Sequence, residues 1–272
     1  MKKLFLSVVF LLSHQFLLHG LAQMPTGHLP FQSGEAVTYI VYYHWGFIWV
    51  SAGEVTFSAD EKEYKEKPVY HFKGVGATYS KYDWFYRVRD IYESYSDTTT
   101  LQPYYFMRDV HEGSYFLHNE YQFNYDEKKI YSSTKIKEKP LKRDTLELPD
   151  CTFDALSMIY YSRCIDFSKH TVGDKIPLTI ILDNEIHNIY IRYLGKEVLD
   201  LDEHGKYNSL KFSPLLVEGS IFKGGEGMTV WVSDDKNKVP LQIETEILVG
   251  SINVIVKNHK GLKHPFTSKI EE

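Results

Sequence analysis

One stretch of alternating residues decides the fold, Tyr115-Phe116-Leu117-His118-Asn119-Glu120-Tyr121-Gln122-Phe123-Asn124-Tyr125. Its apolar side holds Tyr115, Leu117, Tyr121, Phe123 and Tyr125, and its polar side holds His118, Glu120, Gln122 and Asn124. Because successive side chains of a β-strand point to opposite faces, this period of two predicts a strand with one buried face. Such strands are typical of antiparallel sheets that have water on one side.

The same alternation continues on both sides of this stretch. One strand face holds Phe47, Trp49, Val55 and Phe57, and another holds Leu241, Ile243, Ile247 and Val249. Turn residues separate the strands at Glu112-Gly113-Ser114, Asp126–Lys129, Ser233–Asn237 and Gly250-Ser251. The chain is therefore predicted to be mainly β, with about 11–13 antiparallel strands.

One segment has helical spacing instead. Within 150–166 the apolar side chains and one arginine repeat at helical intervals, at Phe153, Leu156, Ile159, Tyr160 and Arg163. Pro149 precedes the segment, and Asp150 or Thr152 can cap it. We expect one principal helix near 150–166 that places the four apolar residues against the sheet, while a replacement of Ser157 changes little.

The two cysteines, Cys151 and Cys164, lie near the ends of this predicted helix. Thirteen positions of continuous helix correspond to about 19 Å. A disulfide needs Cα atoms about 4.4–6.8 Å apart. The two thiols are therefore predicted to be unpaired.

The first 22 residues have the pattern of a secretory signal. Met1-Lys2-Lys3 precedes an apolar run from Leu4 to Leu12, and small residues at Gly20 and Ala22 form a cleavage site. The alternative is a membrane anchor, but polar residues interrupt the run before it reaches the roughly 20 apolar residues of a spanning helix. We expect a cleaved signal peptide over 1–22, a periplasmic or secreted mature chain over 23–272, and no membrane-spanning segment.

The composition excludes one class of partner and favours sheet. Without Lys2 and Lys3 the formal charge falls from −5 to −7, which does not suggest nucleic-acid binding. Aromatic residues form 15% of the chain, with 21 tyrosines, and tyrosine suits half-buried strand surfaces. No Gly/Ser/Pro-rich linker flanks the predicted helix, so one domain over 23–272 is favoured over two separate sheets.

No motif for catalysis, metal binding or cofactor binding is found. The glycine-rich Lys223–Gly227 lacks the ending of a phosphate-binding loop, and neither Gly-x-Ser-x-Gly nor His-Glu-x-x-His occurs. His111 and His118 lack a clear third metal ligand, and Asp234-Asp235 is best explained by turn formation. Arg87 and Arg89 are interpreted as surface ion-pair residues, with an inward arginine that anchors a polar head group as the alternative.

The aromatic surplus has two interpretations, which are core packing and a concave apolar lining for a hydrophobic ligand. A sheet that curves over one helix cannot fill its whole inner side with that helix. The candidate lining comes from the apolar strand faces and the helix: Trp49, Phe57, Tyr121, Phe123, Leu156, Ile159, Ile243 and Ile247.

Three stretches resemble one family of exported bacterial proteins, DUF3108. The first is Phe31–Tyr39 with its Gly34-Glu35 pair, followed by Gly53-Glu54-Val55. The second is Leu148-Pro149 with Phe153–Ser157, Tyr160, Tyr161 and Arg163. The third is Val230–Asp235 with Val239-Pro240 and the strand after Gly250-Ser251. Together they cover nearly all of the chain after residue 22.

This resemblance implies a fold similar to the periplasmic lipoprotein-localisation carriers, in which a curved antiparallel half-barrel is wrapped over a helix. It implies no catalytic residues. Two functions stay open. The first is a non-enzymatic module that binds or carries a hydrophobic, lipid-like molecule. The second is an envelope structural or assembly factor that binds another protein through its sheet.

Overall fold

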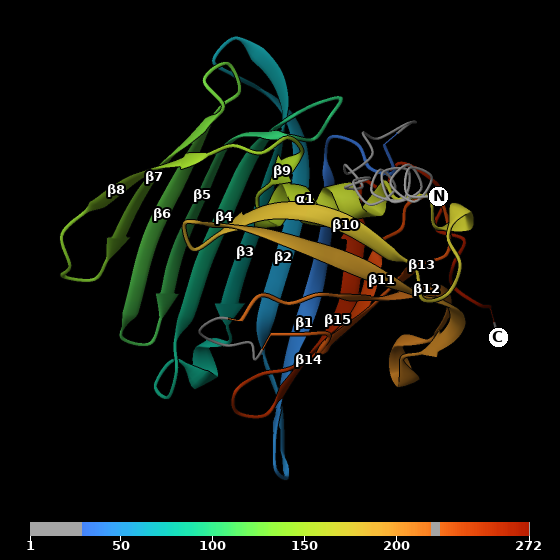
Figure 1. The fold of residues 1–272 in the computed structure, drawn as a ribbon. Helices are drawn as coiled ribbons and strands as arrows, with labels where there is room; N and C mark the ends of the chain where they lie inside the picture. Colours follow the sequence, from blue (N-terminus) through green and yellow to red (C-terminus); the bar gives the residue numbers. More distant parts are fainter. Residues whose placement is uncertain (1–28, 219–223, 272) are drawn as a thin grey trace, which may run out of the picture.

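A computed structural model describes residues 29–218 and 224–271, and most of them belong to one sheet (Figure 1). The sheet has fifteen strands in the order β8-β7-β6-β5-β4-β3-β2-β1-β15-β14-β13-β12-β11-β10-β9. Their bounds are β1 Glu35–Trp45, β2 Ile48–Tyr64, β3 Lys67–Thr78, β4 Val88–Asp97, β5 Pro103–Glu112, β6 Tyr115–Asn124, β7 Lys129–Ile136, β8 Lys142–Glu147, β9 Thr152–Phe153, β10 Lys175–Leu182, β11 Glu185–Asp200, β12 Lys206–Pro214, β13 Met228–Ser233, β14 Pro240–Glu246 and β15 Ser251–Lys260.

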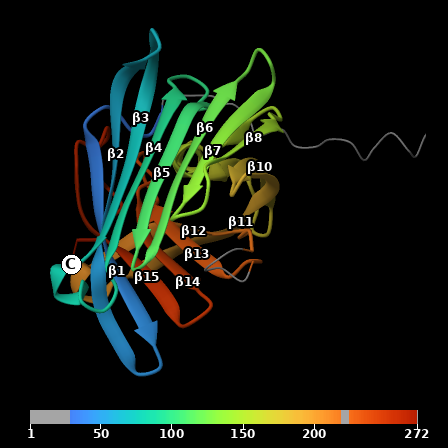
Figure 2. The same ribbon diagram turned by 90° about the vertical axis from the view of Figure 1, so that its left-hand side faces the viewer.

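The sheet is curved and does not close on itself, which is consistent with a half-barrel (Figures 1 and 2). Strand β1 pairs with both β2 and β15, so the first and second halves of the chain share one sheet. The pairs are antiparallel except β9 with β10, which is parallel. The predicted range of 11–13 strands was too low, in part because the two-residue β9 lies inside the segment expected to be helical.

The hairpins form where the turn residues predicted them. Glu112 pairs with Tyr115 across the β5–β6 turn, and Asn124 pairs with Lys129 across the β6–β7 turn. The Ser233–Asn237 turn connects β13 to β14, and the Asp235 carboxylate accepts a hydrogen bond from the Asn237 backbone N–H at 2.9 Å. This bond confirms turn formation for Asp235, whereas the Asp234 carboxylate pairs with Lys196.

The helix is shorter than expected. Helix α1 spans Ala155–Arg163, and its N-cap is Asp154 rather than Asp150 or Thr152. Cys151 has a φ of +57°, and Thr152 pairs with β10, so the chain before Asp154 cannot be helical. Both cysteines are free, as predicted, although their separation does not rest on a continuous helix.

Ser157, where a replacement was expected to change little, is part of the N-terminal cap of the helix. It is fully buried, and its hydroxyl accepts a hydrogen bond from the Asp154 backbone N–H at 3.0 Å. The Asp154 carboxylate in turn accepts from the N–H groups of Leu156 and Ser157. This reciprocal capping box satisfies backbone donors that the first turn leaves free.

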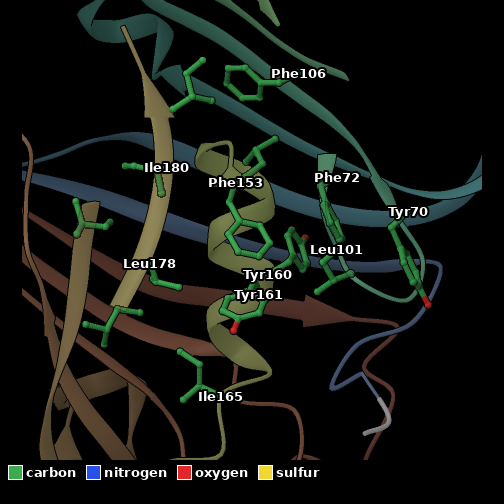
Figure 3. Close-up of a cluster of buried hydrophobic side chains, with 14 of the residues drawn as sticks. Tyr70, Phe72, Leu101, Phe106, Phe153, Tyr160, Tyr161, Ile165, Leu178 and Ile180 are labelled. Carbon is green, nitrogen blue, oxygen red and sulfur yellow. The ribbon is translucent and has the colours of Figure 1, made fainter. Parts of the chain in front are cut away.

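Helix α1 contacts β3, β4, β9 and β10, and a cluster of aromatic side chains fills the space around it (Figure 3). Tyr160 stacks on Phe72 of β3, with ring centroids 3.9 Å apart. Phe153 and Leu156 are each 2% exposed. Ile159 is half-buried and packs against neither hydrophobic cluster, so the sheet-facing position expected for it is wrong.

A buried ion pair ties the helix to distant segments. Arg163, at the end of α1, donates to both carboxylate oxygens of Glu35, at 2.5 and 3.1 Å, and the two side chains are 4% and 1% exposed. The guanidinium also donates to the Asn237 carbonyl at 2.9 and 3.2 Å. The Asn237 side chain is bonded to the backbone of His264. One charge pair therefore connects β1, α1, the β13–β14 turn and the C-terminal segment.

Removal of one partner of this pair should destabilise the protein strongly. Glu35→Ala leaves a buried guanidinium without its counter-ion, and such a loss typically costs about 3–5 kcal/mol of unfolding free energy. Chemical denaturation measures the change. Lys196→Ala removes the exposed pair with Asp234 and should cost below about 1 kcal/mol. Equal effects of the two changes would contradict the central role of Glu35.

Candidate functional site

The side of the sheet that faces α1 is called the inner face here. On β3 it includes Phe72, which stacks on the helix, and Gly74, whose added Cβ would lie 3.5 Å from Leu156 Cδ2. Because side chains alternate along a strand, Gly76 lies on this face and Val75 on the outer face. The strand register places Val55 of β2 and Asp90 of β4 beside Gly76.

Packing on the inner face is uneven along β3. A Cβ added at Gly74 would meet the Phe57 ring at 3.0 Å, so this position is closely packed. A Cβ added at Gly76 would meet only the Val55 Cγ2 atom, at 4.0 Å. The helix therefore fills the inner face as far as Gly74 and leaves the next position uncovered.

Apolar side chains on the same sheet stay partly exposed. Val55 and Tyr92 lie on the strands next to Gly76, and Ile243 and Val254, which pair with each other, lie on β14 and β15 farther across the sheet. Phe57 lies between the two groups. Its ring packs edge-on against the ring of Tyr39, with the two ring centroids 6.0 Å apart. We call Val55, Gly76, Tyr92, Ile243 and Val254 the open part of the inner face.

A charged residue that sequence reasoning missed lies beside the open part. Arg108 of β5 is opposite Tyr92 in the register, and its side chain is only 12% exposed. It pairs with Asp183, while its Nε atom is buried without a hydrogen-bond partner. The signal was available, because Phe106, Arg108 and Val110 share one strand face, which puts a charge among apolar residues.

The turn between β10 and β11 crosses the inner side of the sheet to reach β5–β8. Besides the Arg108–Asp183 pair, the Tyr121 hydroxyl accepts from the Asn184 backbone N–H at 3.0 Å. The Asn184 side-chain oxygen accepts from Ser132 at 2.6 Å. Polar bonds thus hold this turn over the apolar residues of β5 and β6.

The structure places the eight predicted lining residues in three different settings. Tyr121, Phe123 and Leu156 are buried in the main hydrophobic cluster, while Phe57 and Ile243 are partly buried against it. The other three lie away from it. Trp49 is 54% exposed and stacked on Tyr42, Ile159 is on another side of α1, and Ile247 lies in the β14–β15 turn. Alternation alone did not show which residues face the helix.

A depression of about 460 Å³ lies on the outer face of β3, β4 and β5, and none of the eight predicted lining residues contributes to it. Arg89 lines it and is bound to Asp83 at 2.6 Å, so it is a surface ion-pair residue rather than an inward anchor. His111 and His118 lie 3.2 and 3.8 Å from the same Asp109 oxygen. Within the described part of the chain, no group of three or more His, Cys, Asp or Glu residues could hold a metal.

The carboxyl of Asp90 is the titratable group next to Gly76. Burial, reinforced by the nearby Glu112, raises its pKa to about 6, although its bond from the His111 backbone N–H opposes this. The pKa of Glu112 is also raised by burial. Both carboxyls therefore favour the protonated form more than free side chains do.

The raised pKa of Asp90 predicts a pH dependence with a defined sign. Because the folded pKa exceeds the unfolded one, the group favours folding most below about pH 4, and this contribution is lost as the pH rises to about 6. Asp90→Asn removes this titratable group and keeps a side-chain oxygen that can accept the hydrogen bond from the His111 backbone N–H. The melting temperature of the variant, relative to the wild type, should therefore be higher at about pH 7 than at about pH 4. A variant whose melting temperature, relative to the wild type, is higher at about pH 4 than at about pH 7 would refute the raised pKa of Asp90.

The fold and its inner face can now be compared with known proteins. A crystal structure of a β-barrel-like protein of the domain of unknown function DUF1849 from Brucella abortus is similar, with a TM-score of 0.54. It is 6% identical, and the match covers 86% of this chain and 99% of that one, so it shows a shared fold alone. No curated protein matches the sequence. The model of the family described as "Protein of unknown function (DUF3108)" matches residues 38–257, and the chain belongs to this family.

Proposed function

We propose that this protein is exported and acts in the periplasm or cell envelope as a non-enzymatic module that binds or carries a hydrophobic, lipid-like molecule. The ligand would lie on the open part of the inner face. In this arrangement the half-barrel wraps over α1, and α1 forms the inner wall of the ligand site.

One observation carries the proposal, which is the lack of packing at Gly76. A buried strand face normally packs to the density of an organic crystal. Here the inner face has a residue without a side chain, next to apolar groups that stay partly exposed. An acyl chain would cover these groups, at a gain of about 0.8 kcal/mol for each buried methylene.

Arg108 supports a ligand that has a polar end. Its guanidinium lies beside Tyr92, and Asp183, its ion-pair partner among the described residues, is 63% exposed. An arginine next to an apolar surface suits a carboxylate or phosphate head group. The alternative, an assembly factor that binds another protein through its sheet, has less support, because the edge strand β8 carries Lys142, Arg143, Asp144 and Glu147. Charged edge strands disfavour pairing with another strand.

Binding can be blocked without removing any buried contact. Gly76→Phe would place a ring on the open part of the inner face, where a Cβ has room. It should weaken the binding of a fluorescent fatty-acid analogue about tenfold or more, since it occupies the space for an acyl chain. Fluorescence titration gives the affinity.

The matched control is Val75→Phe, the neighbouring position on the outer face, which is 40% exposed. It should leave the affinity unchanged, and thermal melting of both variants confirms folding. If the wild type binds no acyl probe, or if both variants bind as well as the wild type does, the proposed site is wrong.

Export is tested separately. Residues 1–22 lie outside the described residues, so the proposal rests on their sequence pattern. Protein recovered from the periplasm or medium of a bacterial host should begin near Gln23. N-terminal sequencing that finds Met1 on the recovered protein would exclude a cleaved signal.

A further inference from the structure

The two ends of the sheet differ in the chemistry of their turns. At one end the turns are polar, with Tyr64-Lys65-Glu66-Lys67 between β2 and β3 and Asp126-Glu127-Lys128 between β6 and β7. At the other end, the turns of the central strands are apolar, with Gly46-Phe47 between β1 and β2 and Ile247-Leu248-Val249-Gly250 between β14 and β15, whereas the β5–β6 and β7–β8 turns of that end contain Gly113-Ser114 and Lys137-Glu138-Lys139. Turns are normally polar, so apolar turns gathered on neighbouring central strands need a reason.

The apolar turns expose large side chains. Phe47 is 98% exposed, Trp84 and Phe85 of the β3–β4 connection are 83% and 78% exposed, and Leu248 and Val249 are 55% and 56% exposed. We call these five residues the apolar rim. Single exposed apolar residues are ordinary on a protein surface, whereas three neighbouring turns of them are not.

The three turns are neighbours at the same end of the sheet (Figures 1 and 2). They connect strands that are consecutive in the sheet, β4-β3-β2-β1-β15-β14. The Tyr43 hydroxyl of β1 donates to the Val249 carbonyl at 3.0 Å, and the Tyr79 backbone N–H donates to the Ala52 carbonyl at 3.0 Å. These bonds link each outer turn to the central β1–β2 hairpin.

We infer that the apolar rim docks on the surface of a lipid bilayer. Its side chains belong to three separate turns rather than to one strand face. A bilayer accepts such tips without shape complementarity, and tryptophan favours the boundary between head groups and acyl chains. No described helix is long and apolar enough to cross a bilayer.

Charged residues beside the apolar rim also favour a lipid bilayer. The exposed Lys81 and Arg87 flank Trp84 and Phe85, and Asp83 between them is paired with Arg89. The β3–β4 connection therefore has an excess of positive charge, which favours anionic lipid. The exposed Glu246, which precedes the β14–β15 turn, offsets part of this positive charge. The apolar side chains would therefore supply most of the binding free energy.

Vesicle flotation tests the inference with the full mature chain. Wild-type protein should float with vesicles of phosphatidylethanolamine and phosphatidylglycerol. The combined variant Phe47→Ser, Trp84→Ser, Leu248→Ser should lower the partition coefficient about 100-fold, because three apolar side chains no longer enter the lipid. The matched control, Val172→Ser with Val198→Ser, replaces side chains that are 70% and 56% exposed elsewhere, and it should float as well as the wild type.

Three outcomes would overturn the inference. They are a wild type that does not float, a rim variant that floats as well as the wild type, and a control that is weakened as much as the rim variant. Sedimentation velocity without lipid adds a further test. A dimer that the rim variant abolishes, with no flotation of the wild type, would mean that a second copy covers the rim. Because the acyl probe titrates the inner face, failure of probe binding and failure of flotation are distinguishable.

Discussion

The buried bond between Glu35 and Arg163 is the constraint on which the rest of the structure depends. Its partners are 128 residues apart, and the carbonyl that Arg163 also binds, that of Asn237, is 74 residues further along the chain. Two charges out of water need hydrogen bonds, and every side-chain nitrogen and oxygen of this pair takes part in one. Glu35, Arg163 and the Asp235 that shapes the Asn237 turn come from the three stretches that resemble DUF3108. Those stretches meet at one structural site.

Because this bond fixes the end of α1, it also decides how much of the inner face the helix covers. Tyr160 and Leu156 reach Phe72 and Gly74, and packing stops one position further along, at Gly76. The β10–β11 turn crosses to β5–β8 through polar bonds and brings Asp183 to Arg108. The uncovered part is thus bounded by a rigid helix and by a turn held through polar contacts. These are suitable surroundings for a ligand that has an apolar body and a polar end.

The apolar rim and the open part of the inner face lie along the same strands. From Gly76, strand β3 continues to Thr78 and then to the connection that carries Trp84 and Phe85. A bilayer at the rim would therefore meet the sheet at the end toward which the inner face is uncovered. The two proposals rest on different observations, the missing side chain at one glycine and the exposed tips of three turns.

The sequence by itself determined the sheet, its hairpins and the presence of one helix, because alternation and turn residues act over a few positions. It could not locate the start of α1, since the competing partner of Thr152 is β10, more than twenty residues away. Nor could it identify the inner face of the sheet. Periodicity shows that residues share a side but not which side another element covers, so Trp49 and Ile247 were predicted to line it, while Arg108 and Gly76 were missed. Those outcomes depend on contacts between distant residues, and only the tertiary structure decided them.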